Sequence, residues 1–599
     1  LTTGGNNAVS TLFGGVFTGG VDSGLVKTGS GSFTLAGDNR HAGSTTVNDG
    51  TLALAGAGRL AATSSLVVSA GAFDLGGLAD TVAAVRLTGG SIRNGILTST
   101  SAFDLQAGNI GAVLAGNAGL RKTSGGVVTL TAANSLTGTV VVEDGNVLLS
   151  GAGAHLDAAV TLDVRGGVLD LGGNAQAVAA LQQTGGALRN GTLTSASTVD
   201  LRAGTINAVL AGSAGLHKSG TGTATLGASN TDGSTTTVDS GTLALAGAGR
   251  LADASQLVVN GGAFDLGGLA DTVAGVRQTG GAIVNGTLIS TTAFDMQAGT
   301  VSAALAGAVG LNKTTSGTTT LTGANAYTGI TTVGDGVLAL GAFNERLANV
   351  SRVVVNGGTF DLGGFTQTVD AVQQDGGQIS NGNLVSAHNF DMRAGTVSAA
   401  LAGTQGSVGL LKTTAGTLTL RGTNTYTGLT DVQAGLLQLA GPQILASAST
   451  ARVAAGATLS LAGTQDLASL DLAGRLAGTG PLVTPDFRSS SGRIDLPLTA
   501  ATLDISGETQ INADATVGAV RVLAGGELAL SSTGRLINTG DLSVAPAALL
   551  RLLSAQTVGS FSLGGTLVGT GVLTAGSYLL QGGQVLAPLG TGALTSTGA

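Results

Sequence analysis

The chain of 599 residues contains no cysteine and no tryptophan, and all six of its prolines lie beyond residue 441. Without cysteine, the chain can form neither a disulfide nor a thiolate metal site. Glycine is abundant, with 103 residues, but the small number of prolines and the absence of a Gly-X-Y period exclude a collagen triple helix. Composition therefore removes two common ways of stabilising a glycine-rich chain.

Charge and long apolar runs are also scarce. Only 10% of residues are charged, the net charge is −8, and the 26 lysines and arginines are scattered singly, which argues against a nucleic-acid partner. No apolar run reaches the roughly 18 residues of a membrane helix. Apolar residues still make up 43% of the chain, which argues against disorder because the chain can bury surface. The first residues, "LTTGGNNAVS", lack the features of an export signal, so we expect any such signal to be missing or already removed.

What the chain has instead is a long internal repeat. A "GLxK" segment followed by short alternating runs and an asparagine begins at Gly24, Gly119, Gly215, Gly310 and Gly409, in steps of 95, 96, 95 and 99 residues. Each copy holds one lysine, and the chain has no others: Lys27, Lys122, Lys218, Lys313 and Lys412. The leucine before each lysine keeps its place while the residue between them varies, so we expect these leucines to be buried.

Further markers repeat in the same phase. An aspartate in "FDLGG" or "LDLGG" and an asparagine in "NG" recur in four copies, as does the aspartate of "AFDLQAG" and its variants at Asp104, Asp200, Asp295 and Asp391. We expect the first aspartate to bind corner backbone amides, as in an Asx turn, and asparagine and glycine to supply the positive φ of tight corners. These structural repeat positions are Asp74, Asp170, Asp265 and Asp361, and Asn94, Asn190, Asn285 and Asn381.

Each long unit divides into five pieces of about 20 residues, and each piece carries short strand-like runs bounded by glycine or Asn-Gly. This pattern predicts an all-β fold, a single-stranded parallel β-helix (β-solenoid), with coils of about 20 residues grouped in a five-coil super-repeat of about 96 residues. The sequence lacks the consensus of leucine-rich repeats, and an array of β-sandwiches would need longer hairpins.

The markers also predict the organisation of the chain. Residues 1–23 would be the end of a preceding repeat unit, and residues 24–441 a regular β-solenoid with super-repeats starting near 24, 119, 215, 310 and 409. Beyond Pro442 the markers fade while strand-like runs continue, so residues 442–599 are expected to be an irregular continuation of the solenoid.

The five lysines need an interpretation of their own. We expect each to sit at a corner, with its aliphatic stem covering the coil below and its ammonium group in water. A role in isopeptide formation or acylation is the alternative.

Motifs that carry chemistry are scarce. The four histidines, His41, His155, His217 and His388, have no partner at metal-ligand spacing and are expected to be exposed or corner residues. We therefore predict no catalytic residue, no metal site and no cofactor. A polysaccharide-acting β-helix hydrolase or lyase remains the rival hypothesis, and its acids and bases would come from the cluster of Asp486, Arg488, Arg493 and Asp495. Ice binding through threonine ladders is disfavoured, because threonine does not occupy the same slot of every coil.

The segment "GLNKTTSGTTTLTGANAYTGITTVGDGVLALG" from Gly310 and "GLLKTTAGTLTLRGTNTYTGLTDVQAGLLQLAG" from Gly409 resemble the passenger-associated transport repeat of bacterial autotransporters. Intervening segments such as "FDLQAGNIGAVLAGNAGL" look like those of filamentous-haemagglutinin-like exported proteins. The resemblance covers most of residues 1–441 and is looser beyond. It implies a parallel β-helix exported by the type V route through an outer-membrane translocator, and located outside the cell or on the outer surface of a Gram-negative bacterium.

These observations predict a non-enzymatic structural β-solenoid that acts as an adhesin, a biofilm-matrix component or an extracellular filament subunit. A host-cell or matrix receptor is one expected partner. Self-association into fibres is another, because uncapped end coils would present unpaired backbone groups. We expect the chain to be an internal or processed part of a longer exported protein.

Overall fold

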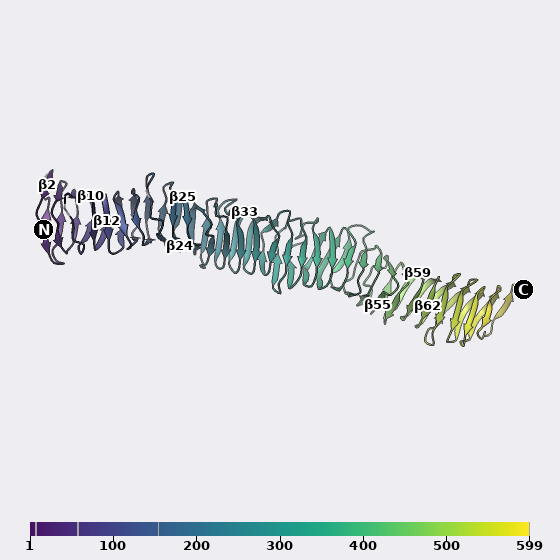
Figure 1. Ribbon diagram of the computed structural model, residues 1–599. Coiled ribbons are helices and arrows are strands. Elements are labelled where there is room, and N and C mark those ends of the chain that lie inside the picture. The colour runs from purple at the N-terminus through teal and green to yellow at the C-terminus, as the bar shows by residue number, and fades with distance from the viewer. Residues whose placement is uncertain (6, 8, 57–58, 154, 598–599) are drawn as a thin grey trace. The chain divides into compact units, whose positions relative to one another are not determined.

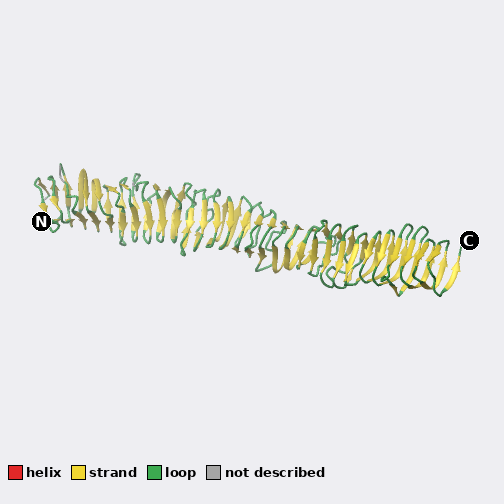
Figure 2. Ribbon diagram, turned by 60° about the horizontal axis from the view of Figure 1, so that its bottom comes forward, coloured by secondary structure: helices red, strands yellow, loops and turns green. Residues whose placement is uncertain are grey.

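The computed structural model describes residues 1–5, 7, 9–56, 59–153 and 155–597. In this part of the chain every regular element is a β-strand and none is a helix (Figure 2). No helix long and apolar enough to cross a membrane occurs among these residues. The contacts divide the chain into two units, the first comprising 1–292 and 300–305 and the second 293–299 and 306–599.

In the first unit, short strands alternate between two parallel sheets, and two or three strands make one coil (Figure 1). In β16 (Leu120–Lys122) and β17 (Val127–Leu130), alternate side chains are buried. The next coil places β19 (Thr139–Val142) beside β16 and β20 (Asn146–Leu149) beside β17, both in parallel register. Period-2 alternation thus decides which residues enter the core, and parallel stacking aligns them from coil to coil.

One super-repeat of this unit runs from β16 to β27. Its remaining strands are β18 (Ser135–Leu136), β21 (Thr161–Val164), β22 (Val168–Asp170), β23 (Ala175–Val178), β24 (Ala180–Gln183), β25 (Ala187–Ser195), β26 (Val199–Leu201) and β27 (Gly204–Ala211).

The second unit is built in the same way. Strands β39 (Leu311–Lys313) and β41 (Thr331–Val333) pair in parallel, as do β40 (Thr318–Leu321) and β42 (Val337–Leu340). Register continues past Pro442, because β52 (Thr430–Val432) pairs with β54 (Thr450–Val453) and β53 (Leu436–Leu439) with β55 (Thr458–Leu461). The later coils include eight-residue strands such as β59 (Leu482–Ser489) and β61 (Leu498–Ile505), which pair from end to end except at Pro485.

The interior of each unit consists mainly of leucine, valine and small residues. The leucine of each "GLxK" segment is at most 3% exposed, in agreement with the repeat phase: Leu25, Leu120, Leu216, Leu311 and Leu410. All strand pairs among the described residues are parallel, and no antiparallel hairpin occurs there. The predicted β-solenoid is therefore confirmed.

Candidate functional site

The five lysines lie inside the stack. In β39 the alternation Leu311–Asn312–Lys313 puts the lysine on the same inward face as the leucine, and Lys313 is fully buried. The same is true of Lys27, Lys122, Lys218 and Lys412. The expectation that the ammonium groups stay in water is wrong, because each finds backbone acceptors inside the corner.

Each lysine binds carbonyl oxygens of two successive coils. The Nζ atom of Lys313 donates to the carbonyl of Thr315 and, at 3.1 Å, to the carbonyl of Asp335 in the next coil. In the other copies the acceptors also stand two and 22 residues beyond the lysine: Gly29 and Asp49, Ser124 and Asp144, Gly220 and Ser240, and Thr414 and Ala434. Burial lowers the pKa of all five lysines. The repeated lysine therefore ties the corners of two coils together.

The corner that receives the lysine requires glycine. Gly336, which follows Asp335, has a φ of 62°, and a Cβ there would lie 2.3 Å from the carbonyl oxygen of Gly317. The equivalent glycines of the other copies have φ between 61° and 69°. Positive φ at this position points the preceding carbonyl at the ammonium group.

In other coils, glutamine replaces lysine in binding the corner carbonyls. It stands in the same column of inward-facing residues, which are register partners from coil to coil. Parallel register carries this column from Lys122 through Val142 and Val164 to Gln183. The Nε2 atom of Gln183 donates to the carbonyls of Gly186 and Thr205, both at 3.2 Å. Gln278 and Gln374 make the corresponding pairs of bonds. Sequence reasoning missed these glutamines, although period-2 alternation places them on the face of the buried valines.

A second buried polar position is occupied by aspartate in two coils and by glutamine in four others. Gln367 accepts a hydrogen bond from the backbone N–H of Leu347 at 2.8 Å and donates one to the Leu347 carbonyl at 3.1 Å. Gln176, Gln465 and Gln556 likewise accept from a backbone N–H of the preceding coil and donate to a carbonyl there. Asp80 and Asp271 stand at the equivalent positions and accept the same N–H bond, from Leu60 and Leu251.

The carboxyl group of Asp271 lacks the donor that glutamine supplies. Its Oδ1 atom is buried and has no hydrogen-bond partner among the described residues. Burial, assisted by the nearby Asp253, raises the pKa of Asp271 to about 6. Burial likewise raises the pKa of Asp80. A protonated carboxyl at this position would reproduce the donor of the glutamine amide.

Replacing Asp271 by glutamine is therefore expected to stabilise the first unit at neutral pH. Since the folded-state pKa lies above the usual value of 3.8, folding of the native chain binds a proton between these two pKa values. The native chain should lose on the order of 3 kcal/mol as pH rises from about 4 to above 6. Denaturant unfolding at a series of pH values measures this loss.

The Asp271→Gln variant should lose less stability over that interval and should be the more stable protein at pH 7. Gln367→Glu is the matched reverse exchange, and it should create a comparable pH dependence in the second unit. An unchanged pH profile in the Asp271→Gln variant would show that the buried carboxyl is ionised at no cost.

The "DLGG" aspartates and the "NG" asparagines meet at another corner. The Oδ1 atom of Asp74 accepts the N–H of Gly76 at 3.0 Å, and its Oδ2 atom accepts from the side chain of Asn94 at 2.9 Å. The same aspartate–glycine and aspartate–asparagine bonds occur in the other three copies. The four asparagines have φ between 55° and 57°. The aspartate side chain thus closes the turn of its own coil and, through the asparagine, fixes the turn of the next coil.

The asparagine that ends each lysine-containing segment joins coils as well. Asn424 donates to the carbonyls of Gly422 and Ile444, and its Oδ1 atom accepts the N–H of Leu401. Two residues on, Tyr426 is buried and bonds to Thr430 through its hydroxyl at 2.9 Å. Tyr327 and His41 make the same bond to Thr331 and Thr45, whereas the second repeat has the buried apolar residues Leu136 and Val140 at the corresponding positions.

Comparison with known protein families matches these segments. The model of the passenger-associated-transport-repeat matches residues 25–54, 120–149, 216–245, 311–340 and 410–439. The chain contains five passenger-associated-transport-repeats. No curated protein and no solved structure matches the chain.

The five transport repeats and the β-solenoid agree with the resemblance to an autotransporter passenger. Such repeats imply a secreted or cell-surface location in Gram-negative bacteria, with an outer-membrane translocator as a partner. The buried lysine, the corner asparagine and the tyrosine or histidine all lie within the matched segments. The lysine and the asparagine that all five transport repeats share therefore bind one coil to the next.

The acid and arginine cluster beyond the transport repeats is divided between two sheets. Arg488 pairs with Asp486 at 2.6 Å on β59, whereas Arg493 pairs with Asp495 next to β60 (Gly492–Ile494) on the opposite sheet. Asp495 also accepts a bond from Arg475 at 2.7 Å. The structure thus places these four side chains in two separate ion-paired groups.

The four histidines occupy different surroundings. His41 is 2% exposed, so the expectation of an exposed or corner residue is wrong there, and burial lowers its pKa. His155 is exposed, His217 pairs with Asp239 at 2.6 Å on the surface, and the Nδ1–H of His388 donates to the carbonyl of Asp370 at 2.9 Å. Within the described residues, no three histidine, aspartate or glutamate side chains gather as metal ligands.

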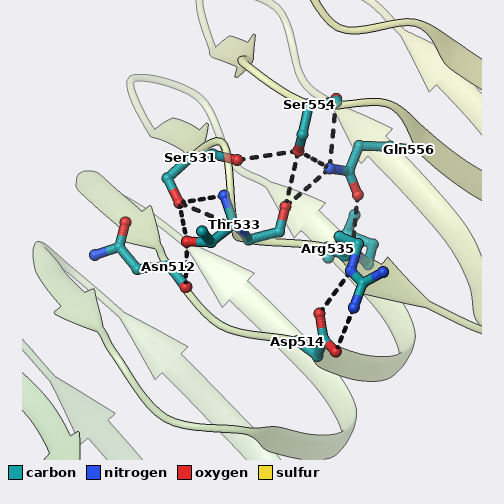
Figure 3. Close-up of polar contacts among 9 residues, drawn as sticks. Asn512, Asp514, Ser531, Thr533, Arg535, Ser554 and Gln556 are labelled. Atoms are coloured by element: carbon teal, nitrogen blue, oxygen red, sulfur yellow. Dashed lines mark hydrogen bonds and ion pairs between the residues drawn. The ribbon is translucent and has the colours of Figure 1, made fainter.

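In the coils after the last transport repeat, polar side chains again bind groups of neighbouring coils. Figure 3 shows Gln556 donating to the hydroxyl of Ser554, which in turn donates to the carbonyl of Ser531. Beside them, Arg535 makes two hydrogen bonds to Asp514, at 2.9 and 3.0 Å. The Ser554–Ser531 and Arg535–Asp514 contacts connect successive coils (Figure 3).

Proposed function

We propose that this chain is a non-enzymatic structural β-solenoid of the bacterial surface, acting as an adhesin, a biofilm-matrix component or a filament subunit. The observation that carries the proposal is the use of the repeated polar residues. Lysine, glutamine, asparagine and aspartate at the repeat positions all bind backbone or side-chain groups of neighbouring coils. These side chains stabilise the stack of coils, and their polar atoms are not free to act on a substrate.

The transport repeats and the fold support a structural passenger role. Their low charge and their surfaces of threonine, serine and alanine suit a chain that extends from a cell and makes contacts over length. Self-association and receptor binding are the finer parts of the proposal, and each needs its own measurement.

Surface display is tested by fusing the chain to an outer-membrane translocator in a Gram-negative host. The account predicts that protease added to intact cells removes the chain, and that displaying cells aggregate or attach more than cells bearing the translocator alone. Display with no change in aggregation, attachment or biofilm mass would contradict the adhesive role. Polysaccharide cleavage that disappears in an Asp486→Asn or Asp495→Asn variant would replace it with the enzyme hypothesis.

A further inference from the structure

Two cavities lie in line along one edge of the second unit. One of about 520 Å³ is lined by Arg452, Asp471 and Arg488 together with small residues such as Ala455 and Ser490. The other, of about 370 Å³, begins at Arg521 and is lined by Ser543 and Ser562 together with Leu523, Pro546 and Gln581. Both follow the carboxyl ends of strands in the same sheet.

Parallel register places the two cavities along one outward column of residues, and we call this column with its two cavities the groove. Their wall is a single outward column that steps from one coil to the next through β54, β57 (Ser469–Leu472), β59, β61, β63 (Ala515–Val522), β66 (Thr539–Val544) and β68 (Gln556–Leu563). Its members are Arg452, Asp471, Arg488, Asp504, Arg521, Ser543 and Ser562. At the usual spacing of parallel strands the column is on the order of 30 Å long.

The column alternates donors and acceptors that are only partly used. Arg452 pairs with Asp431 and Arg488 with Asp486, each at 2.6 Å, and each guanidinium keeps further N–H donors exposed. The carboxylate of Asp471 stands between these two arginines and attracts Arg452 electrostatically, and further along the column Asp504 pairs with Arg521 at 3.5 Å. Beyond Arg521 the wall continues with hydroxyl groups.

We propose that this groove binds a neutral, hydroxyl-rich linear polysaccharide that lies along the stack of coils. A sugar hydroxyl both donates and accepts, so a row of sugars can satisfy arginine and aspartate in alternation. The small side chains of the corner let an extended chain approach the wall.

Other polymers fit less well. A polyanion such as nucleic acid would meet the carboxylates of Asp471 and Asp504 in the same row. A peptide strand could not extend the sheet there, because the backbone groups of these strands already pair with neighbouring coils. The groove thus favours a partner with many hydroxyl groups and little charge.

This inference gives a ligand class to the surface role proposed above and rests on that role only for access to the polymer. Binding is measured on the purified chain, so it can fail while surface display succeeds, and the reverse. The probes are a soluble linear neutral glucan, a linear mannan and polygalacturonate, each titrated by calorimetry.

Saturable binding to the neutral glucan or the mannan is expected. Asp471→Ala and Arg488→Ala should each weaken it about tenfold or more, which is the usual effect of losing a hydrogen bond to a charged group. Ala455→Trp should abolish binding by filling the groove while it leaves every charge in place. Arg551→Ala, an exposed ion-paired arginine of the other sheet, is the matched control and should bind as the unchanged chain does.

Three outcomes would overturn the proposal. They are binding to polygalacturonate alone, binding to none of the three polymers, and binding to a neutral polymer that survives all three groove substitutions. Far-UV circular dichroism checks that each variant keeps the β-fold, and because all three altered side chains are exposed, we expect it to do so.

Discussion

Replacing Leu311 by aspartate is expected to open the stack around the fourth transport repeat. Leu311 is fully buried and lies in register between Phe294 and Thr331 of the adjoining coils. The substitution removes a core side chain and places an unpaired carboxylate in the interior, which together should cost on the order of 4 kcal/mol or more. Amide hydrogen exchange should show lost protection in the strands on both sides of β39.

Asn312→Asp is the control for this experiment. Asn312 follows Leu311 in the same strand but points outward, so the same carboxylate stays in water. We expect its exchange pattern to match that of the unchanged chain and its free energy of unfolding to fall by less than about 1 kcal/mol, because the new carboxylate stands beside Asp295 of the adjoining coil. Equal protection in the two variants would mean that the alternation of β39 does not decide what lies in the core.

Replacing Lys313 by methionine should also destabilise the second unit strongly. The carbonyls of Thr315 and Asp335 would lose their donor, and neither accepts another hydrogen bond among the described residues. Leaving each carbonyl unpaired costs about 1–3 kcal/mol, whereas removing the buried charge returns part of its desolvation cost. Two orphaned carbonyls should outweigh that gain, with a net loss of about 2–3 kcal/mol in denaturant unfolding.

The chain itself provides the rescuing variant. Glutamine binds the corresponding pair of corner carbonyls at Gln278 and Gln374, so Lys313→Gln should recover a large part of the lost stability. Methionine and glutamine differ little in size, and the comparison therefore isolates the hydrogen bonds. A methionine variant as stable as the glutamine variant would show that the lysine acts only as an apolar stem.

Much of the fold could be predicted because the same sequence pattern occurs in several copies. Four markers in one phase, with alternation inside each copy, are sufficient to predict parallel coils of about 20 residues and the burial of Leu311 and its equivalents. The burial of the lysines was predictable as well. Lys313 stands two residues after Leu311, so the alternation of the strand puts both side chains on the same inward face. We expected the ammonium group in water because lysine usually prefers water.

Other features depend on register that no short segment reveals. Arg488 and Arg493 are close in sequence, yet the corner after Ser489 sends them to opposite sheets. Asp471 and Arg488 are 17 residues apart, yet they stand side by side on the outer face. Coil lengths vary by several residues, so the column that lines the groove could be assembled only after the strand pairing was known.

The central claim is that each super-repeat only lengthens the stack of coils and carries no chemistry of its own. Deleting one super-repeat tests this claim most directly. Removing residues 120–215 joins Gly119 to Leu216 and restores a "GL" junction in phase, whereas removing residues 120–205 joins Gly119 to Ile206, which belongs to the other sheet. Since each coil contacts only its neighbours, the in-phase deletion should keep the thermal unfolding midpoint and the exchange protection of the flanking coils. The out-of-phase deletion should lower both. If the in-phase deletion unfolds the flanking coils as much as the out-of-phase one, the super-repeats are not interchangeable lengths of solenoid, and the account is contradicted.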